Sequence, residues 1–312
     1  MAKVVTLTPN PALDIATSVE KLLPSHKLRC GPVRRDPGGG GINVARVIHR
    51  LGGKVVAVYS CGGGSGDELR DLLRREGLLH RAVHVAGHTR ESFNITEDAS
   101  GSQFRFILPG DPMTEGEAKR CIDVAVSLVA SGDYVVGSGS LPPGPPVDFY
   151  ARFIRAAVAK GAKSVIDTQG ASLRAVLEAG VDVLKASARE MGEYLGVEPK
   201  EAGAWPQACR ELVKSGKAGL IAVTLGKDGA VLINGSRAWH AAVPTVTSTT
   251  TVGAGDSFLG GLLTKLVEHQ DLADALRYAA SAGTAALFTH GTGLCDPAEV
   301  EKLYAATSVK EL

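Results

Sequence analysis

The chain of 312 residues lacks several features that would assign its class directly. Its five cysteines are scattered, odd in number and never spaced as C-x-x-C, which argues against a disulfide framework and against a zinc site. The formal net charge of +1 provides no general attraction for nucleic acid or for an anionic membrane surface. No apolar run is long enough to cross a bilayer, and the first residues lack the pattern of a secretory signal. We therefore expect a cytoplasmic protein that binds neither nucleic acid nor membrane.

Several catalytic motifs are also missing. There is no G-x-x-x-x-G-K-[ST] sequence, which excludes a P-loop enzyme. There is no G-x-G-x-x-G either, because residues 62–67 (GGGSGD) fail at the third glycine, and this argues against a nicotinamide-dependent oxidoreductase. The chain contains no H-E-x-x-H or G-x-S-x-G, and its eight histidines are dispersed.

What the chain does contain is abundant glycine (38 residues) and a regular alternation of strand and helix patterns. Residues 4–8 and 54–60 predict strands, whereas residues 42–51 and 67–76 predict helices with one apolar face. The alternation continues through residues 134–184 and 220–233, and helical patterns follow over 256–269, 272–287 and 297–306. This order predicts a mainly parallel sheet covered by helices on both faces, in one α/β domain over 1–312 or in two smaller domains.

Two stretches interrupt the alternation. Residues 15–36 have strand-like pieces without a helical period, and residues 91–96 and 102–108 alternate around a turn as in a β-hairpin. They predict a small β-lid from insertions at about 12–36 and 88–108, with ordinary surface hairpins as the alternative. Its apolar side would either cover the lid's own cleft or form a homodimer, and it contains Phe93, Ile95, Phe104 and Phe106.

The segment 249–258 (TTTVGAGDSF) carries the strongest chemical signal. The successive N–H groups of Gly253, Ala254 and Gly255 can form an anion-binding concavity at the positive end of a helix that begins at Asp256. Such a concavity suits the charge that develops in phosphoryl transfer, and Asp256 could accept the proton of the attacking hydroxyl. The alternative is that Asp256 only caps the helix.

A second glycine cluster, residues 37–45 (PGGGGINVA), also precedes a helix. A polyol can approach its backbone closely, and Asn43 offers both donors and acceptors. A flexible loop is the alternative, although glycines that abut a helix start favour a rigid use. Asp14 follows the first strand, where it could either bind sugar hydroxyls or cap a turn.

Residues 37–46 (PGGGGINVAR) and 251–257 (TVGAGDS) together resemble the two signatures of the ribokinase/PfkB carbohydrate kinase family, in the same order and separation. The resemblance covers essentially the whole chain. It implies a ribokinase-like three-layer α/β/α fold with a β-lid, and an ATP-dependent kinase in which Asp256 is the base and Gly253 to Gly255 form the anion hole. It further implies two sets of acceptor contacts: Asp14, Gly39, Gly40 and Asn43 for the sugar, and Lys27, Arg90 and Ser140 for its phosphate.

The resemblance also implies the nucleotide and metal contacts. Glu190 would organise Mg²⁺ through water, and the carbonyls of Val252 and Ala286 with Thr250 form a candidate K⁺ site. The chain departs from the family in having residues 185–187 as KAS where Lys-Pro-Asn is usual, and in having Thr289 and Gly293 where K⁺-activated relatives often have Asn and Arg. The implied ATP contacts are Lys185, Ser187, Thr224, Gly226, Gly229 and Ser248.

Short segments that match particular family members narrow the choice of acceptor sugar. Residues 27–30 (KLRC), 138–144 (SGSLPPG) and 291–295 (GTGLC) are similar to family members that phosphorylate fructose 6-phosphate, while residues 8–14 (TPNPALD) are also similar to members that act on fructose 1-phosphate or tagatose 6-phosphate. The leading prediction is the glycolytic conversion of fructose 6-phosphate and ATP to fructose 1,6-bisphosphate and ADP. A non-catalytic sugar-phosphate sensor on the same fold is the alternative from another class. Because such relatives dimerise through their lids, a homodimer is expected.

Overall fold

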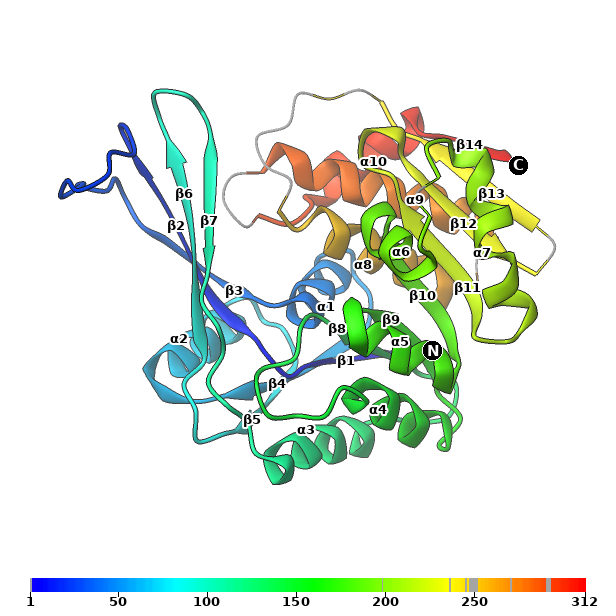
Figure 1. The fold of residues 1–312 in the computed structure, drawn as a ribbon, viewed down its shortest axis with the longest axis horizontal. Coiled ribbons are helices and arrows are strands. Elements are labelled where there is room, and N and C mark those ends of the chain that lie inside the picture. Colours follow the sequence, from blue (N-terminus) through cyan, green and yellow to red (C-terminus); the bar gives the residue numbers. More distant parts are fainter. Residues whose placement is uncertain are drawn as a thin grey trace.

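The computed structural model describes residues 2–197, 199–235, 237–244, 246, 252–269, 271–289 and 293–312. Its centre is a ten-stranded sheet in the order β14-β13-β12-β11-β10-β9-β8-β1-β4-β5 (Figure 1). The pairs from β5 across to β11 are parallel, whereas the pairs from β11 to β14 are antiparallel. The bounds of the strands are β1 (Val4–Thr8), β4 (Val55–Cys61), β5 (His80–His84), β8 (Tyr134–Ser138), β9 (Lys163–Asp167), β10 (Val181–Ser187), β11 (Ala218–Thr224), β12 (Ala230–Asn234), β13 (Arg237–Ala242) and β14 (Ser308–Glu311).

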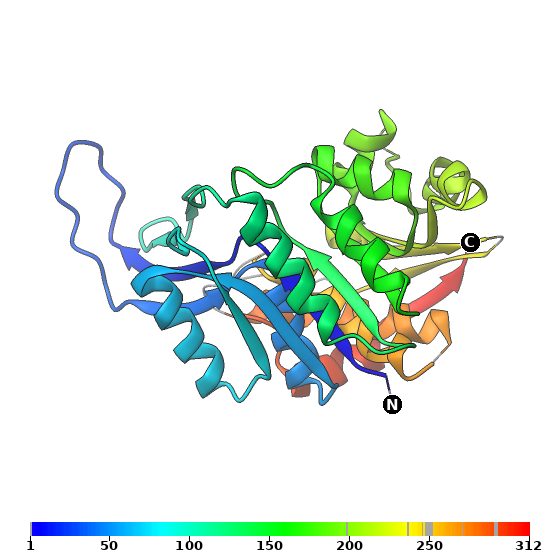
Figure 2. The ribbon, with the colours of Figure 1, turned by 90° about the horizontal axis from the view of Figure 1, so that it is seen from below.

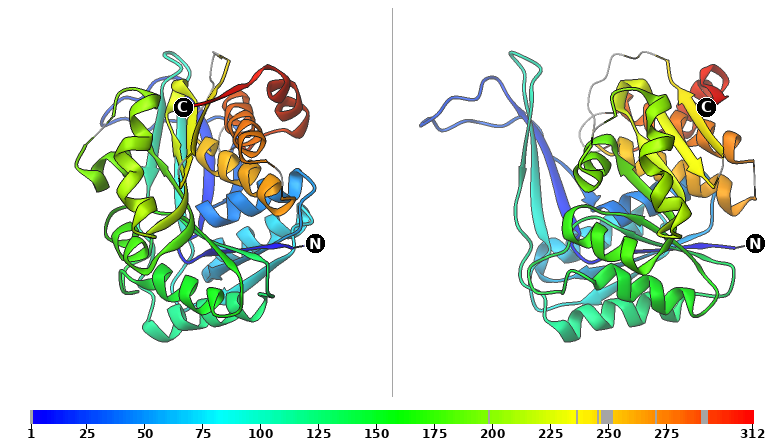
Figure 3. Two further views of the ribbon diagram at one scale, coloured as in Figure 1. Left: turned by 90° about the vertical axis from the view of Figure 1, so that its right-hand side faces the viewer. Right: turned by 45° about the vertical axis from the view of Figure 1, so that its right-hand side comes forward.

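Helices cover both faces of this sheet, as the left panel of Figure 3 shows. Alternate residues of β1 enter separate cores, since Val5 and Leu7 pack in one and Val4 in the other. The first core is closed by α3 (Glu115–Ser127), α4 (Phe149–Val158), α5 (Gly170–Ala179), α6 (Ala188–Leu195) and α7 (Trp205–Lys214). The opposite face is covered by α1 (Gly40–Arg50), α2 (Gly63–Arg75), α8 (Ala254–Val267), α9 (Leu272–Ala285) and α10 (Pro297–Ala306). No helix in the described part of the chain has the length and apolar character that a membrane span requires.

A second sheet of four strands, in the order β3-β2-β6-β7, forms the lid. Its strands are β2 (Ala12–Val19), β3 (Arg34–Gly38), β6 (Arg90–Glu97) and β7 (Gln103–Ile107). β2 pairs with β3 and β6 with β7 in antiparallel fashion, while β2 and β6 pair in parallel. The lid projects from the main body, and the loop between β2 and β3 extends furthest (Figure 2).

The register gives this lid two chemically different faces. Asp14, Ser92 and Ile107 are paired across three strands, as are Ala16, Asn94 and Arg105, so that face is largely polar. The intervening residues form the opposite face, which is mostly apolar toward β7 and contains Ile15, Phe93, Ile95, Phe104 and Phe106.

The predicted helix bounds differ from the structure mainly at glycines. The helix predicted from residue 42 begins at Gly40, and that predicted from Asp256 begins at Ala254. The apolar pattern does not reveal the first turn of these helices, because glycine has no side chain that could mark an apolar or a polar face. Six elements were not predicted, namely α3, α6, α7, β5, β13 and β14. In β14 (SVKE) none of the side chains is fully buried, so its sequence lacks the apolar alternation that indicates a strand.

Candidate active site

Polar residues and helix starts gather at the carboxyl edge of the parallel sheet. β9 ends at Asp167 and β10 at Ser187, and α1 begins against the end of β8, where a Cβ on Gly40 would lie 2.3 Å from Ser138 Oγ. Ligands of open α/β sheets bind in the crevice at this edge. The candidate site therefore lies between this edge and the lid.

Asp256 is the third residue of α8 and does not cap the helix. The N-cap is Gly253, whose φ of 76° is readily adopted only by glycine, and no side chain caps the helix. The first-turn amides of Ala254 and Gly255 have no partner within the helix, so they remain available to an anion. Asp256 instead accepts a hydrogen bond from Asn43 Nδ2 at 2.9 Å through Oδ2, which ties α8 to α1.

The surroundings of Asp256 suit a base. Burial raises the pKa of its carboxyl group, while the hydrogen bond from Asn43 and the charges of Lys185 and Arg105 oppose that rise. A carboxylate with a raised pKa accepts a proton more readily than an ordinary one. Asn43 also fixes the orientation of the carboxylate, leaving Oδ1 without a partner from that amide.

A buried ion pair lies directly behind the anion hole. Lys185 Nζ is 3.0 and 3.1 Å from the two carboxylate oxygens of Asp167, and Lys185 is 6% exposed. A Cβ on Gly255 would lie 2.9 Å from the same Nζ, so the cation sits against the backbone of the hole. Burial alone would lower the pKa of Lys185, but Asp167, Asp256 and Glu190 together raise it. The ammonium group therefore stays charged where phosphoryl charge would collect.

The glycine loop before α1 is packed rather than flexible. A Cβ on Gly38 would lie 2.2 Å from Asp14 Oδ2, and Gly39, with φ of 112°, would bring one to 2.8 Å from Thr8 Cγ2. Side chains are thus excluded, so Asp14 and the loop backbone lie close together. The alternative of a flexible loop is wrong.

Asp14 is a second carboxylate with a displaced pKa. Burial, assisted by Asp36, raises the pKa of its carboxyl group to about 6, against the charges of Arg90, Arg105 and Arg46. It lies in the lid on the same face as Arg105. Two acidic groups, one on the lid and one on α8, are thus available to bind the hydroxyls of a sugar.

Arg90 and Ser140 are linked through Asn10. Arg90 Nη2 donates to the Asn10 carbonyl at 3.5 Å, and Asn10 Nδ2 donates to Ser140 Oγ at 3.2 Å. Burial lowers the pKa of Arg90, with Asp14 opposing, and the buried Nε of Arg90 has no hydrogen-bond partner among the described residues. A guanidinium with a spare donor suits a phosphate group. The structure therefore brings two of the three predicted phosphate contacts together.

The third predicted contact, Lys27, is not brought to them. β2 and β6 run in register from the pairing of Ala12 with Arg90 to that of Val19 with Glu97. At a rise of about 3.3 Å per residue, the seven residues between these two pairs correspond to a distance of roughly 23 Å along the strands. Lys27 is exposed and belongs to the loop between β2 and β3. This loop extends beyond the far end of β2 (Figure 2). Its contact with the acceptor phosphate stays a prediction that requires either a second chain or a movement of this loop.

Four of the six predicted ATP contacts line a cleft of about 470 Å³ beside the predicted anion hole, whereas Lys185 lies against Gly255 and does not line this cleft. Ser187, Thr224, Gly226 and Gly229 form its β10 and β11 side, and Ala254 and Gly255 form the end next to Asp256. Ser248 lies outside the described residues. The remaining lining was not predicted and is largely apolar, as an adenine ring requires, and it consists of Lys227, Ala230, Val243, Pro244, Val246, Phe258, Ala280, Gly283, Thr284 and Leu287.

The residues present suit a hydrated Mg²⁺. Glu190 Oε2 accepts from the Ser187 N–H at 2.8 Å in a capping box at the start of α6, which leaves its other oxygen outside that bond. Glu190 and Asp256 both act electrostatically on Asp167, so the three carboxylates share one region. Within the described residues, no three acidic, His or Cys side chains could hold a metal directly. Mg²⁺ commonly keeps several waters and binds mainly through substrate phosphates, which fits this arrangement.

The candidate K⁺ ligands are less well supported. The Ala286 carbonyl already accepts from the Thr289 N–H at 3.3 Å and from Thr289 Oγ1 at 2.8 Å. Thr250 lies outside the described residues, and Val252 is engaged in contacts of its own. K⁺ binding therefore stays a prediction.

Three site residues were missed in the sequence. Asp167 follows a predicted parallel strand, so its position at a strand end could have identified it. Arg105 sits on the polar lid face and acts on Asp14 and Asp256, but only the strand register reveals that face. Asn10 offers no signal in the sequence, because its role depends on contacts 80 and 130 residues away.

Comparison with known families now decides the class. The model described as "pfkB family carbohydrate kinase" matches residues 10–299. The chain belongs to the pfkB family of carbohydrate kinases. The predicted family and enzyme class are thereby confirmed.

Curated relatives from two organisms are named ATP-dependent 6-phosphofructokinase isozyme 2. The one from Mycobacterium tuberculosis is 39% identical over 302 residues, which cover 97% of this chain and 89% of the relative. The one from Escherichia coli is 37% identical over 309 residues, which cover 99% and 100%.

Solved structures agree with this pfkB assignment. Phosphofructokinase-2 from Escherichia coli in complex with potassium superposes with a TM-score of 0.94 at 36% identity, covering 98% of this chain and 99% of that one. The same enzyme in complex with fructose-6-phosphate gives a TM-score of 0.92 at 35% identity, with the same coverage. Ribokinase from Thermotoga maritima, at 18% identity with a TM-score of 0.78 and coverage of 98% and 100%, shows the fold alone. The predicted ribokinase-like three-layer fold is confirmed.

Proposed function

We propose that this chain transfers the γ-phosphoryl group of ATP to the 1-hydroxyl of fructose 6-phosphate, giving fructose 1,6-bisphosphate and ADP. The observation that carries the proposal is the position of Asp256. It follows Gly255, which lines the nucleotide cleft. It also accepts a hydrogen bond from Asn43, which lies on α1 directly after the glycine loop that would contact the sugar. The base thus stands where the attacking hydroxyl and the γ-phosphoryl group would meet.

Each part of the site has a task in this reaction. Asp14 and Asn43 bind sugar hydroxyls, and Arg90 with Ser140 binds the 6-phosphate, which fixes the 1-hydroxyl toward Asp256. Asp256 accepts the hydroxyl proton as the new P–O bond forms and the bond to ADP breaks. Lys185 and the amides of the anion hole stabilise the charge on the transferring group. Glu190 would hold Mg²⁺ through water, and the ion would supply charge neutralisation for the β- and γ-phosphates.

Fructose 6-phosphate is favoured over other acceptors by the names of the relatives. Both curated relatives at 37–39% identity are 6-phosphofructokinases, and one solved relative was crystallised with fructose-6-phosphate. Fructose 1-phosphate and tagatose 6-phosphate remain the alternatives, because the same groups could bind either.

A coupled assay of ADP release tests the proposal. We expect the highest kcat/KM with fructose 6-phosphate, and lower values with fructose 1-phosphate, tagatose 6-phosphate and unphosphorylated fructose. Preference for either of the other phosphorylated sugars would replace the acceptor while keeping the chemistry. Binding of sugar phosphate, seen as a shift in melting temperature without any ADP release, would favour the sensor alternative instead.

We infer further that the chain forms a homodimer through the apolar face of its lid. Phe104 and Phe106 are 39% and 48% exposed, and the register places Phe106 beside Phe93 and Phe104 beside Ile95 on one face. Adjacent exposed aromatic groups of this kind are typical of interaction surfaces. A crystal structure of Escherichia coli phosphofructokinase-2 is described as a tetrameric inhibited form, so an assembled state occurs in a relative.

A further inference from the structure

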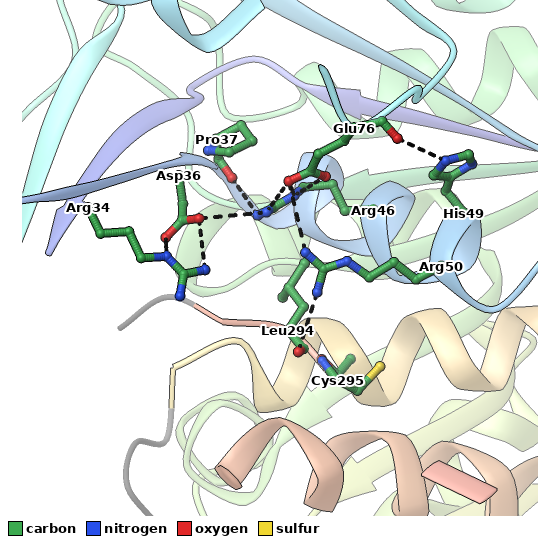
Figure 4. A network of polar contacts seen from close by, with 10 residues as sticks. Arg34, Asp36, Pro37, Arg46, His49, Arg50, Glu76, Leu294 and Cys295 are labelled. Carbon is green, nitrogen blue, oxygen red and sulfur yellow. Dashed lines mark hydrogen bonds and ion pairs between the residues drawn. The ribbon is translucent and has the colours of Figure 1, made fainter. Parts of the chain in front are cut away.

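Arg46 is a buried cation that the reaction described above does not use. It lies on α1, three residues after Asn43, and is 1% exposed. Its guanidinium group binds Glu76 through Nε to Oε2 at 2.8 Å and through Nη2 to Oε1 at 2.5 Å, and Nη1 donates to the Pro37 carbonyl at 2.8 Å (Figure 4). Nη2 is also 4.0 Å from Asp36 Oδ1. Because a buried guanidinium is costly to desolvate, its partners must hold it closely.

The partners of Arg46 belong to the segment that supports the sugar-binding residues. Asp36 and Pro37 are the residues of β3 directly before Gly38, against which the Asp14 carboxylate lies. In the lid register, Asp36 pairs with Asp14. On the other side, Glu76 is the C-cap of α2, and α2 packs against both β2 and β3. Arg46 therefore joins α1, α2 and the inner edge of the lid.

Of the three arginines whose charges act on Asp14, Arg46 is the one whose side chain is fully buried. Burial and the neighbouring Asp36 raise the pKa of the Asp14 carboxyl group, and Arg90, Arg105 and Arg46 lower it. Arg90 and Arg105 come from the lid strands that face the acceptor, so a bound sugar phosphate would share their charge. Arg46 is shielded by protein on all sides, so its charge acts on the lid carboxylates whether or not substrate is present.

The other cation beside Asp36 is more exposed. Arg34, on β3 itself, pairs with Asp36 at 2.8 Å, but about half of its side chain is open to solvent. Arg46 lies further from Asp36, at 4.0 Å, but it is 1% exposed, so solvent screens its charge less than that of Arg34.

We propose that Arg46 is a positioning residue for the acceptor sugar, which holds the β3 segment before Gly38 and offsets the charge of Asp36 so that Asp14 binds sugar hydroxyls as a carboxylate. The inference rests on the proposed function, since it concerns the same acceptor site. It distinguishes Arg46 from Glu76, whose task would be to anchor the guanidinium rather than to act on Asp14.

Three variants separate these roles: Arg46→Gln removes the charge, Arg46→Lys keeps it, and Glu76→Gln breaks the anchoring pair while leaving Arg46 cationic. The measurements are KM for fructose 6-phosphate and for ATP, the pH profile of kcat/KM for the sugar phosphate, and the melting temperature. If the wild type prefers another sugar phosphate, that sugar replaces fructose 6-phosphate throughout.

For Arg46→Gln we expect a rise of about tenfold in KM for the sugar phosphate, with KM for ATP nearly unchanged. The acid limb of its profile should move to higher pH, because loss of a positive charge raises the pKa of Asp14. Arg46→Lys should restore the position of the acid limb. Glu76→Gln should lower the melting temperature without moving the acid limb.

Equal kinetic losses in Arg46→Gln and Glu76→Gln, without a displaced acid limb, would mean that Arg46 is only structural and would overturn the proposal. If Arg46→Gln does not fold, Arg46→Lys decides the positioning role, because a single ammonium nitrogen cannot occupy the separate positions of Nε, Nη1 and Nη2 that bind Glu76 and the Pro37 carbonyl. A raised sugar-phosphate KM in that variant supports the proposal, and an unchanged one contradicts it. A wild type that phosphorylates no sugar phosphate refutes the proposed function itself, before any variant is compared.

Discussion

Asp256 and Asp14 are the same kind of residue in two different surroundings. Asp256 lies in the first turn of α8, bonded to Asn43 and near Lys185. Asp14 lies on a lid strand against the backbone of Gly38. Both pKa values are raised by burial, but only Asp256 adjoins the cleft that would hold the nucleotide. Position, rather than acidity, therefore separates the proposed base from the proposed sugar-binding carboxylate.

Replacing Asp256 with Asn tests its role as the base. The amide has nearly the same shape but cannot accept the hydroxyl proton, so we expect kcat to fall by roughly 10²- to 10⁴-fold. ATP affinity, measured by calorimetry, should stay close to that of the wild type. Asp123→Asn, an exposed change on α3, is the matched control and should leave kcat unaltered. Near-normal turnover in the Asp256 variant would refute its assignment as the base.

The raised pKa values predict an unusual acid limit for activity. The sugar hydroxyls need ionised carboxylates as acceptors, and the pKa of Asp14 is raised to about 6. Binding of sugar phosphate should therefore weaken as the pH falls through about 6, instead of near 4 as for an ordinary aspartate. Affinity for the sugar phosphate across pH 5 to 8, with Asp14→Asn as the comparison, measures this. A wild-type profile that is flat down to about pH 5 would contradict the prediction.

At the level of elements, glycines allow α8 to approach its neighbours. A Cβ on Gly260 would lie 2.4 Å from Val47 Cγ1 of α1, and one on Gly261 would lie 2.8 Å from the Ala282 Cβ of α9. Close packing of α8 on α1 is what lets Asn43 reach Asp256. The glycines of the loops and of the helix interfaces thus contribute to the same arrangement, in which Asn43 reaches Asp256.

Gly260→Ala tests this packing. The methyl group would push α8 away from α1, so we expect a loss of about 1–3 kcal/mol in the free energy of unfolding, together with a lower kcat. Gly64→Ala is the control, since Gly64 lies near the start of α2 and its Cβ would meet nothing within 4 Å. That change should be neutral, or stabilise by up to about 1 kcal/mol through helix propensity. Chemical denaturation of both variants gives the comparison, and equal effects would show that the α1–α8 contact is tolerant.

At the scale of the whole molecule, the lid has two faces with two tasks. Its polar face carries Asp14 and Arg105 toward the site, while its opposite face presents Phe104 and Phe106. Because the lid strands are long, Lys27, in the loop after β2, lies far from Arg90, which pairs with the start of β2. Association through the apolar face would bury the aromatic groups and change what surrounds that loop.

Phe106→Asp should disrupt the proposed lid dimer. A charge in an apolar interface must be desolvated, so we expect the dimer dissociation constant to rise at least about tenfold, with monomer dominant at micromolar concentration. Sedimentation velocity measures the distribution. Val158→Asp is the control, because Val158 is a similarly exposed apolar residue (46%) at the end of α4, far from the lid in sequence. A monomeric wild type, or a dimer that survives Phe106→Asp, would place the interface elsewhere.

Much of the fold could be predicted because its signals are local. The alternation of apolar strands with amphipathic helices follows from side-chain periodicity, and it correctly indicated the mainly parallel sheet and most of its strands. Elements with weak burial, such as β14, escaped because their apolar pattern is faint. The glycine starts of α1 and α8 were placed two residues late for a similar reason.

The family assignment and the predicted reacting groups both came from short motifs, in which glycines and a carboxylate lie within a few residues of one another. How these groups are supported became visible only in the folded chain. The pairing of Lys185 with Asp167, the link from Arg90 through Asn10 to Ser140, and the burial of Arg46 all join residues that are distant in the chain. Such contacts leave no local pattern, since they arise when the sheet and the lid bring separate segments to one edge.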